Sequence, residues 1–281
     1  SGGTTGSPKC ALGTHQSLVI CSTQLHVYAR TAINDWTDVI ILIMPMFHIY
    51  GNMGMCTSLV AHWQISLVPN PRDLDDVVAT INKTRPAILH GVPTLFNSLM
   101  NHPAVKSGKV DFSSLKVCYS AAAPLMAETK QRFEKLTGGR LLEAYAMTET
   151  MLATTVCPVN GVYKIGSTGI PVPDVEVRIV DLESGKIEQP ANVPGEIIIT
   201  APQLMEGYWG RPEETAEMIR DGWVYTGDIG YMDEDGYIFI VDRKKDVIKP
   251  SGFQVWPREV EEVIATHPAV ADVCVGGMPD T

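Results

Sequence analysis

The sequence lacks any apolar run long enough to cross a membrane. The longest one covers residues 39–44 and ends at Pro45, whereas a membrane-spanning helix needs roughly 20 apolar residues. The chain also does not begin with a basic segment followed by an apolar one, so we expect no signal peptide. We therefore predict a cytoplasmic protein with no transmembrane segment.

Cysteine is sparse and positive charge is in deficit. The six cysteines are scattered and form no CxxC pair, which predicts reduced, partly buried thiols instead of a disulfide framework or a zinc site. The 22 Lys and Arg residues are outnumbered by 32 Asp and Glu residues, so the net charge is −10 at pH 7. An acidic chain has no general attraction to nucleic acid or to anionic membranes, and neither is an expected partner.

The composition is that of a folded protein, because 45% of the residues are hydrophobic and only 19% are charged. Short apolar runs at residues 39–43, 65–68, 87–90 and 115–120 are typical of strands buried on both faces. Helical patterns lie between several of these runs. This alternation predicts an α/β fold with a largely parallel sheet.

Two helices are expected in this first half of the chain. Residues 74–81 place apolar side chains at helical spacing, and Asp73 is positioned to cap the helix. A second helix begins near Pro124 and ends at Gly138. Its expected buried residues are Met126, Phe133 and Leu136.

The pattern changes after Gly166 to short runs that alternate or are bounded by turn residues. These runs cover residues 175–179, 195–200, 223–225 and 237–241. They predict a β-rich portion with short hairpins.

Three segments carry residues suited to a nucleotide. Residues 1–9 read SGGTTGSPK, in which glycine backbone, hydroxyls and Lys9 are suited to a polyphosphate. In residues 144–150, AYAMTET, the Tyr145 ring suits a base, and Glu149 beside a hydroxyl suits Mg²⁺. Asp228 follows a predicted strand and could hold ribose hydroxyls. Taken singly, a flexible linker, a strand end and a solvated turn are the alternatives.

Further motifs stand in a fixed order along the chain, and together they resemble the adenylate-forming superfamily of acyl-CoA ligases, adenylation domains and luciferases. The resemblance covers nearly the whole chain and is greatest to fatty-acyl-CoA ligases. The motifs are SGGTTGSPK (1–9), MPMFHIYG (44–51), SAAAP (120–124), YAMTE (145–149), GE (195–196), GY (207–208), YTGD (225–228), DR (242–243) and KPSGFQV (249–255).

The resemblance implies a role for each matching residue. It implies catalytic roles for His48, Lys9, Glu149 and Lys249, with Glu149 also the Mg²⁺ ligand. Lys245 matches the hinge, and Lys249 and Gly252 match lid positions used in the coenzyme A step. The implied ATP- and AMP-binding residues are Thr4, Thr5, Gly6, Lys9, Ala122, Ala123, Pro124, Ala144, Tyr145, Thr148, Asp228 and Arg243.

The implied fold is a layered α/β adenylate-forming core with a β-rich subdomain and the start of a small C-terminal α+β lid. Residues 1–170 would form the α/β subdomain with the phosphate loop and adenine site. Residues 171–241 would form the β-rich subdomain, 242–245 the hinge, and 246–281 the beginning of the lid.

The implied activity is that of an acid–thiol ligase. A carboxylic acid and ATP give acyl-AMP, and the thiol of coenzyme A then gives acyl-CoA. The neutral, mostly apolar region around His48 favours a fatty acid over an amino acid. The alternatives are an adenylation domain that loads a carrier protein and a catalytically inactive nucleotide-binding module. The resemblance leaves open whether the chain forms a homodimer.

The sequence also departs from the family pattern. Cys10, Ala121 and Ala146 stand where glycine is usual. The family's N-terminal region and the catalytic lysine of its lid have no counterpart in these residues. We therefore expect a fragment that is inactive as a ligase by itself.

Overall fold

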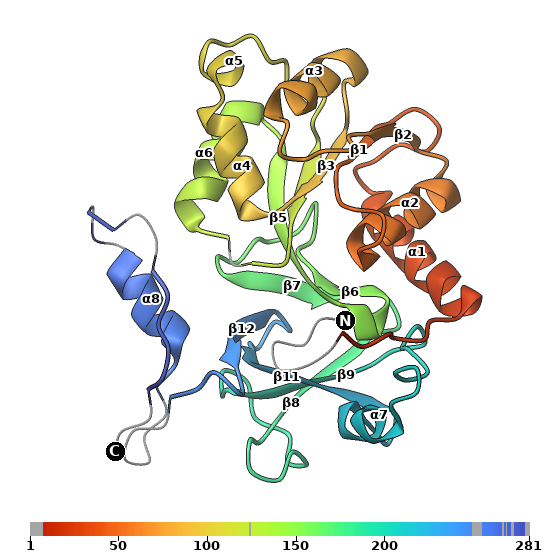
Figure 1. Ribbon diagram of the computed structural model, residues 1–281, viewed down its shortest axis with the longest axis vertical. Helices are drawn as coiled ribbons and strands as arrows, with labels where there is room; N and C mark the ends of the chain where they lie inside the picture. Colours follow the sequence, from red (N-terminus) through yellow and green to blue (C-terminus); the bar gives the residue numbers. More distant parts are fainter. Residues whose placement is uncertain are drawn as a thin grey trace. The chain divides into compact units, whose positions relative to one another are not determined.

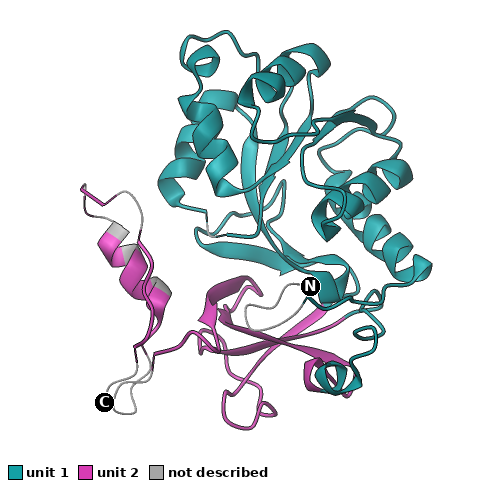
Figure 2. Cartoon of the chain, in the orientation of Figure 1, with its two compact units in different colours: residues 1–175, 201–216 teal, residues 176–200, 217–281 magenta. Residues whose placement is uncertain are grey.

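The computed structural model describes residues 8–123, 125–248, 255–265, 267, 269–270 and 273–278. The predictions for Thr4, Thr5, Gly6, Pro124, Lys249 and Gly252 therefore lie outside the described residues. The chain divides into two compact units, shown in Figure 2. Unit 1 comprises Ser1–Val175 and Ala201–Ala216, and unit 2 comprises Glu176–Thr200 and Glu217–Thr281.

Unit 1 is built on a mixed sheet in the order β2-β1-β3-β4-β5-β6-β7. The pairs from β2 to β5 are parallel, and β6 and β7 continue the sheet in antiparallel pairing. The predicted α/β fold with a largely parallel sheet is thus confirmed for this unit. The strands are β1 (Val39–Leu42), β2 (Gln64–Leu67), β3 (Ile88–Gly91), β4 (Val117–Ser120), β5 (Arg140–Met147), β6 (Leu152–Val156) and β7 (Ser167–Pro171).

Helices flank the sheet of unit 1 on both faces (Figure 1). On one face, Ile41, Leu89 and Cys118 join a buried apolar cluster with helix residues such as Phe96 and Phe133. The helices on this side are α3 (Leu74–Thr84), α4 (Pro93–Asn101), α5 (Pro103–Lys106) and α6 (Ala127–Thr137). The opposite side carries α1 (His15–Ala29) and α2 (Ile49–Ala61).

Helix α3 forms where the sequence predicts it. The Asp73 carboxylate accepts a hydrogen bond from the backbone N–H of Asp76 at 3.1 Å, which satisfies one of the unpaired N–H groups of the first turn. Val77, Val78 and Ile81 are buried on one face. Cap and apolar stripe together fix the position of this helix.

Helix α6 differs from its prediction in what it buries. Phe133 is fully buried, as expected, but Met126 and Leu136 are 51% and 43% exposed. Met126 is the N-cap and precedes the first turn, and Leu136 lies in the last turn, two residues before the C-cap Gly138. The inward face is completed by other residues, among them Lys130, and the helix ends at Gly138 in the left-handed conformation.

Unit 2 has an antiparallel sheet in the order β12-β11-β9-β8, and β10 pairs with β11. The predicted β-rich portion is present, although residues 201–216 group with unit 1. The elements are β8 (Glu176–Val180), β9 (Gly195–Thr200), β10 (Ile219–Arg220), β11 (Trp223–Met232), β12 (Ile238–Arg243) and α8 (Pro257–Ala265); α7 spans Pro212–Met218 and η1, a 3₁₀ turn, Thr148–Thr150.

Asp228 lies inside β11, so the prediction that it follows a strand is wrong. The strand is irregular at this point, because its register against β9 shifts between Tyr225 and Ile229 and Gly227 has a φ of +71°. Residues 225–228 therefore resemble a turn in the sequence although they belong to one long, irregular strand.

Two further expectations concern cysteine and membranes. All six cysteines are free, and Cys21, Cys118 and Cys157 are buried. Among the described residues, no helix is long and apolar enough to cross a membrane.

Ala122 occupies a strained backbone position and supports a first prediction. Its φ is +70°, whereas Ala121 and Ala123 are not in the left-handed region. An alanine there costs about 1–2 kcal/mol, which glycine avoids at an entropic cost of about 0.5–1 kcal/mol. We expect Ala122→Gly to raise the free energy of unfolding, measured by urea denaturation, by up to about 1 kcal/mol.

Ala123→Gly is the matched control, because Ala123 is also exposed but needs no left-handed backbone. This control should lower the free energy of unfolding. Equal effects of the two substitutions would contradict the assignment of strain to Ala122.

Candidate functional site

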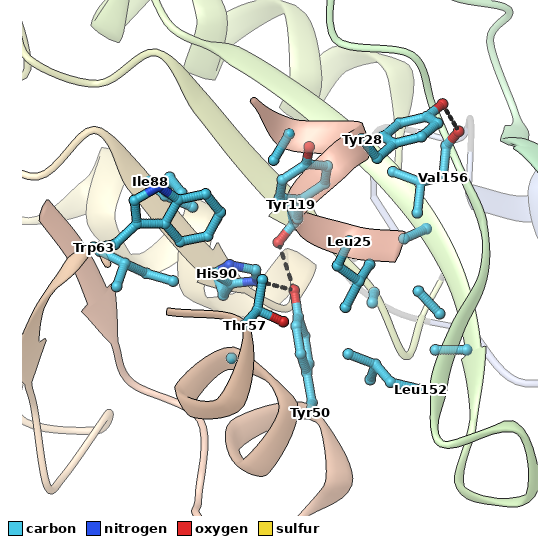
Figure 3. A pocket seen from close by; sticks show the side chains of 17 residues that line it. Leu25, Tyr28, Tyr50, Thr57, Trp63, Ile88, His90, Tyr119, Leu152 and Val156 are labelled. Atoms are coloured by element: carbon cyan, nitrogen blue, oxygen red, sulfur yellow. Dashed lines mark hydrogen bonds between the residues drawn. The ribbon is translucent and has the colours of Figure 1, made fainter. Parts of the chain in front are cut away.

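A cavity lies in unit 1 between one face of the sheet and the helices α1 and α2 (Figure 3). Alternate residues of three neighbouring strands line it, since successive side chains of a strand point to opposite faces. These pairs are Ile88 and His90 of β3, Tyr119 of β4 and Ala121 just after it, and Ala144 and Ala146 of β5; the other lining residues are Leu25, Tyr28, Ala29, Ile40, Tyr50, Gly54, Thr57, Trp63, Leu152, Ala153 and Val156.

Small residues leave room for this cavity. Ala121, Ala144 and Ala146 present only methyl groups to it from the sheet, and Gly54 faces it from α2. A Cβ on Gly54 would lie 2.8 Å from Cδ1 of Leu42, so α2 approaches the sheet closely at this point. The cavity therefore results from small side chains beneath a closely packed helix.

The strand β5 separates Tyr145 from the cavity. Ala144 and Ala146 line the cavity, but Tyr145 between them does not. Tyr145 is itself buried. Ala144, predicted to bind nucleotide, is thus placed on the cavity wall, while Tyr145 belongs to the other face of the strand.

His48 caps the helix that forms one wall of the cavity. Its Nδ1 accepts a hydrogen bond from the backbone N–H of Tyr50 at 3.1 Å. In the neutral ring the proton is then on Nε2, so the exposed imidazole can donate a hydrogen bond from that atom. A Cβ on Gly51 would lie 2.3 Å from the carbonyl oxygen of Pro45, so only glycine lets the preceding turn hold His48 there.

A polar cluster beside this wall was not predicted from the sequence. The Tyr50 hydroxyl donates to the carbonyl oxygen of Tyr119 at 3.2 Å, and Nδ1 of His90 lies 2.9 Å from the same hydroxyl. Burial lowers the pKa of His90 to about 4, because the charged ring would lose its hydration, and the imidazole is neutral at pH 7. The one sequence feature that could have indicated this cluster is His90 at the end of the apolar run of residues 87–90.

Lys9, the last residue of the predicted phosphate loop, lies beside the motif of Gly207 and Tyr208, which is far away in the sequence. Backbone hydrogen bonds of 2.8 Å join Leu12 N–H to the Gly207 carbonyl and Trp209 N–H to the Cys10 carbonyl. This pairing places the Lys9 Nζ 5.0 Å from the centre of the Tyr208 ring.

Tyr208 in turn contacts Glu149. Its hydroxyl donates a 2.6 Å hydrogen bond to Oε1 of Glu149, and both residues are buried. The backbone N–H of Met205 also donates to the Glu149 carbonyl at 2.9 Å. The Glu149 carboxylate and the hydroxyl of the partly exposed Thr148 next to it in the sequence are oxygen donors of the kind that fit a hard cation bound with phosphate oxygens.

In unit 2 the structure pairs two predicted nucleotide-binding residues. Asp228 and Arg243 are opposite each other in β11 and β12, and Nε of Arg243 lies 3.2 Å from Oδ1 of Asp228. Asp228 is 6% exposed, so the arginine helps to hold a nearly buried carboxylate. The guanidinium is half-exposed and orients that carboxylate.

Lys244, the residue directly after β12, also makes a specific contact. Lys244 Nζ lies 2.7 Å from Oε2 of Glu196, and Oε1 of Glu196 accepts from the backbone N–H of Gly227. Lys245, the predicted hinge, is exposed in the following turn. Ala122 and Ala123 are likewise exposed, at the end of β4.

The contact between Tyr208 and Glu149 leads to a second prediction. Tyr208→Phe leaves a buried carboxylate without its hydroxyl donor, which typically costs about 1–3 kcal/mol. We expect the free energy of unfolding to fall by that amount in urea denaturation. In Glu149→Gln the amide oxygen still accepts the bond, so the loss should be smaller. A loss below about 0.3 kcal/mol in Tyr208→Phe would show that the hydroxyl does not hold Glu149.

His90 leads to a third prediction, on pH. The unfolded chain takes up a proton on this histidine near pH 6.5, while the folded chain does so only near pH 4. The unfolded state therefore binds more protons between these values, and stability falls as the pH is lowered from about 6.5. His90→Gln should flatten the slope of unfolding free energy against pH between 6.5 and 5, by up to about 1.4 kcal/mol per pH unit. If the slope in His90→Gln equalled that of the wild type, the pKa of His90 would not be lowered by burial, and the prediction would be wrong.

Several known proteins are similar to this chain in sequence and in fold. The chain is 39% identical to a long-chain-fatty-acid–CoA ligase of Bacillus subtilis (strain 168), over 100% of the chain and 50% of that protein. It superposes on ATP-bound MatB from Rhodopseudomonas palustris with a TM-score of 0.86 and 34% identity, over 99% of the chain and 54% of MatB.

A second similar structure is the o-succinylbenzoate CoA synthetase MenE from Bacillus subtilis in complex with the acyl-adenylate OSB-AMP. The TM-score is 0.87 at 26% identity, over 100% of the chain and 56% of MenE. The chain thus spans about half the length of the curated relatives it matches. The model of the family described as AMP-binding enzyme matches residues 1–209. The chain therefore belongs to the AMP-binding enzyme family.

Proposed function

We propose that this chain supplies the nucleotide and acid sites of an ATP-dependent acid–thiol ligase that forms acyl-CoA. A carboxylate oxygen of the acid attacks the α-phosphorus of ATP, the bond to the bridging oxygen breaks, and pyrophosphate leaves. The sulfur of coenzyme A then attacks the carbonyl carbon of acyl-AMP, the thiol proton is lost, and AMP leaves. One observation carries the proposal. Lys9, Tyr208 and Glu149 belong to three separate family motifs, and contacts through Tyr208 bring them together.

The cavity is the proposed site of the acid's tail. None of its 17 lining residues is Lys, Arg, Asp or Glu, so it suits an uncharged chain or ring. An amino acid would bring an ammonium group that finds no carboxylate there. A fatty acid is the substrate that we propose, and the identity to a long-chain-fatty-acid–CoA ligase supports it.

His48 is the proposed contact for the carboxylate. It precedes the helix that lines the cavity, and its Nε2–H can donate a hydrogen bond to an anionic oxygen. Holding the carboxylate in place converts its attack on phosphorus into a step between bound partners, which is the main contribution an enzyme makes to this class of reaction.

The proposed nucleotide-binding residues would each contact a different part of ATP. Tyr145 would stack on adenine beside Ala122 and Ala123, and Asp228 would accept hydrogen bonds from the ribose hydroxyls. Lys9 would contact the β- and γ-phosphates. Mg²⁺, when bound on Glu149 and the phosphates, would supply charge stabilisation to the developing pyrophosphate. These local contacts explain how a polyanion could bind a chain with a net charge of −10.

Nucleotide binding to the 281-residue chain tests the proposal and is our fourth prediction. Lys9→Ala removes a contact to the β- and γ-phosphates, so calorimetry should show MgATP binding weakened about tenfold or more, with AMP binding nearly unchanged. Lys135→Ala, on the exposed side of α6, is the matched control and should change neither affinity. Failure of the wild-type chain to bind either nucleotide would contradict the proposed function, and equal weakening of both would contradict the role of Lys9.

A further inference from the structure

One end of the cavity is polar in a way that a fatty-acid tail does not use. Thr57 on α2, Trp63 before β2 and His90 on β3 are drawn on the same side of Figure 3, across from Leu25 and Leu152. Two other polar side chains of the lining are occupied, because the Tyr28 hydroxyl donates to the Val156 carbonyl at 2.6 Å and the Tyr50 hydroxyl donates to the Tyr119 carbonyl.

Two side-chain atoms at this polar end are buried without a partner among the described residues. They are Oγ1 of Thr57 and Nε1 of Trp63, in side chains of residues that are 5% and 7% exposed. Buried hydroxyl and N–H groups in native proteins nearly always have a partner, since each unmade hydrogen bond destabilises the fold.

Other hydroxyl side chains in the helices of this chain bond to a backbone carbonyl one turn earlier, and within the described part of the chain that of Thr57 does not. Ser58 donates to the Gly54 carbonyl at 2.7 Å, and Thr84 on α3 donates to that of Thr80 at 2.8 Å. Such back-bonding satisfies a hydroxyl within a helix. Thr57 makes no such bond among the described residues, so its donor and its acceptor are both available to a ligand in the cavity.

His90 adds an acceptor to the same end. With the Tyr50 hydroxyl donating its one proton to the Tyr119 carbonyl, the bond between His90 and Tyr50 needs a proton on Nδ1 of His90, which then donates to the Tyr50 oxygen. Nε2 then carries a lone pair, and it has no hydrogen-bond partner in the described chain. The ring is neutral, and no Lys or Arg lines the cavity, so a second carboxylate would find no counter-charge there.

We propose that the cavity binds a carboxylic acid whose tail carries an uncharged hydroxyl group, held between Thr57 and His90. A hydroxyl both donates and accepts, so it matches the acceptor Nε2 of His90 and the hydroxyl of Thr57. This inference rests on the proposed function, which places the reacting carboxylate at His48. Thr57 is nine residues further along α2, or about 13 Å at a rise of about 1.5 Å per residue.

The test compares two acids that differ by one hydroxyl, decanoic acid and 10-hydroxydecanoic acid. Their binding to the 281-residue chain is measured by calorimetry with AMP present. Wild type should bind the hydroxy acid at least about tenfold more tightly, because the plain acid leaves the polar atoms unpaired. Tighter or equal binding of decanoic acid would overturn the inference and leave the proposed function standing.

Thr57→Val removes the hydroxyl at nearly constant volume and should abolish the preference, while Thr57→Ser should keep it. Ser58→Ala is the matched control, because Ser58 is buried on the same helix but does not line the cavity; the preference should persist in it. A preference that survives Thr57→Val would contradict the inference.

Two readouts separate the possible failures. Binding of AMP without binding of either acid would overturn the assignment of the cavity, whereas loss of AMP binding in the wild type would overturn the proposed function itself. Urea unfolding gives a check that needs no ligand. Thr57→Val should leave the midpoint unchanged or raise it, since no bond is lost, and Ser58→Ala should lower it. A lower midpoint in Thr57→Val would show that the hydroxyl is already paired.

Discussion

The hydrogen bond from the Tyr208 hydroxyl to Glu149 is the contact on which the proposed nucleotide site depends. It joins residues 59 positions apart in the sequence within one buried region. The Lys9 ammonium lies over the Tyr208 ring, so one aromatic side chain positions both the cation and the carboxylate. Because both bonded groups are buried, neither can exchange its partner for water without a loss of stability.

Local sequence signals predicted much of unit 1 correctly. Asp73 and the apolar stripe of α3 specify a helix through contacts within a few residues, so they could be recognised without the fold. Leu136 was misassigned because an apolar residue in a helix is buried only if its side of the helix meets a neighbour. Asp228 was placed after a strand because the turn-like Gly227 before it belongs to an irregularity within β11.

The cavity could not be predicted in the same way. Its walls depend on the alternation of β3, β4 and β5 and on how closely α2 packs, which bring together Ala121 and Ala144 from separate strands. The polar end depends on which buried atoms remain without a partner, as at Thr57, and this is a property of the packed structure. Family motifs suggest which residues bind the nucleotide, but motif order says nothing about the acid's tail, for which the proposal rests on the residues that line the cavity.

We propose that one face of β5 serves the nucleotide and the other the acid. A crystal structure of this chain with a non-hydrolysable acyl-adenylate analogue, an acyl-sulfamoyl adenosine, provides the test of this proposal. Adenine should lie against Tyr145, and the acyl tail should lie in the cavity beside Ala144 and Ala146. Adenine inside the cavity, or an acyl tail bound elsewhere, would contradict it.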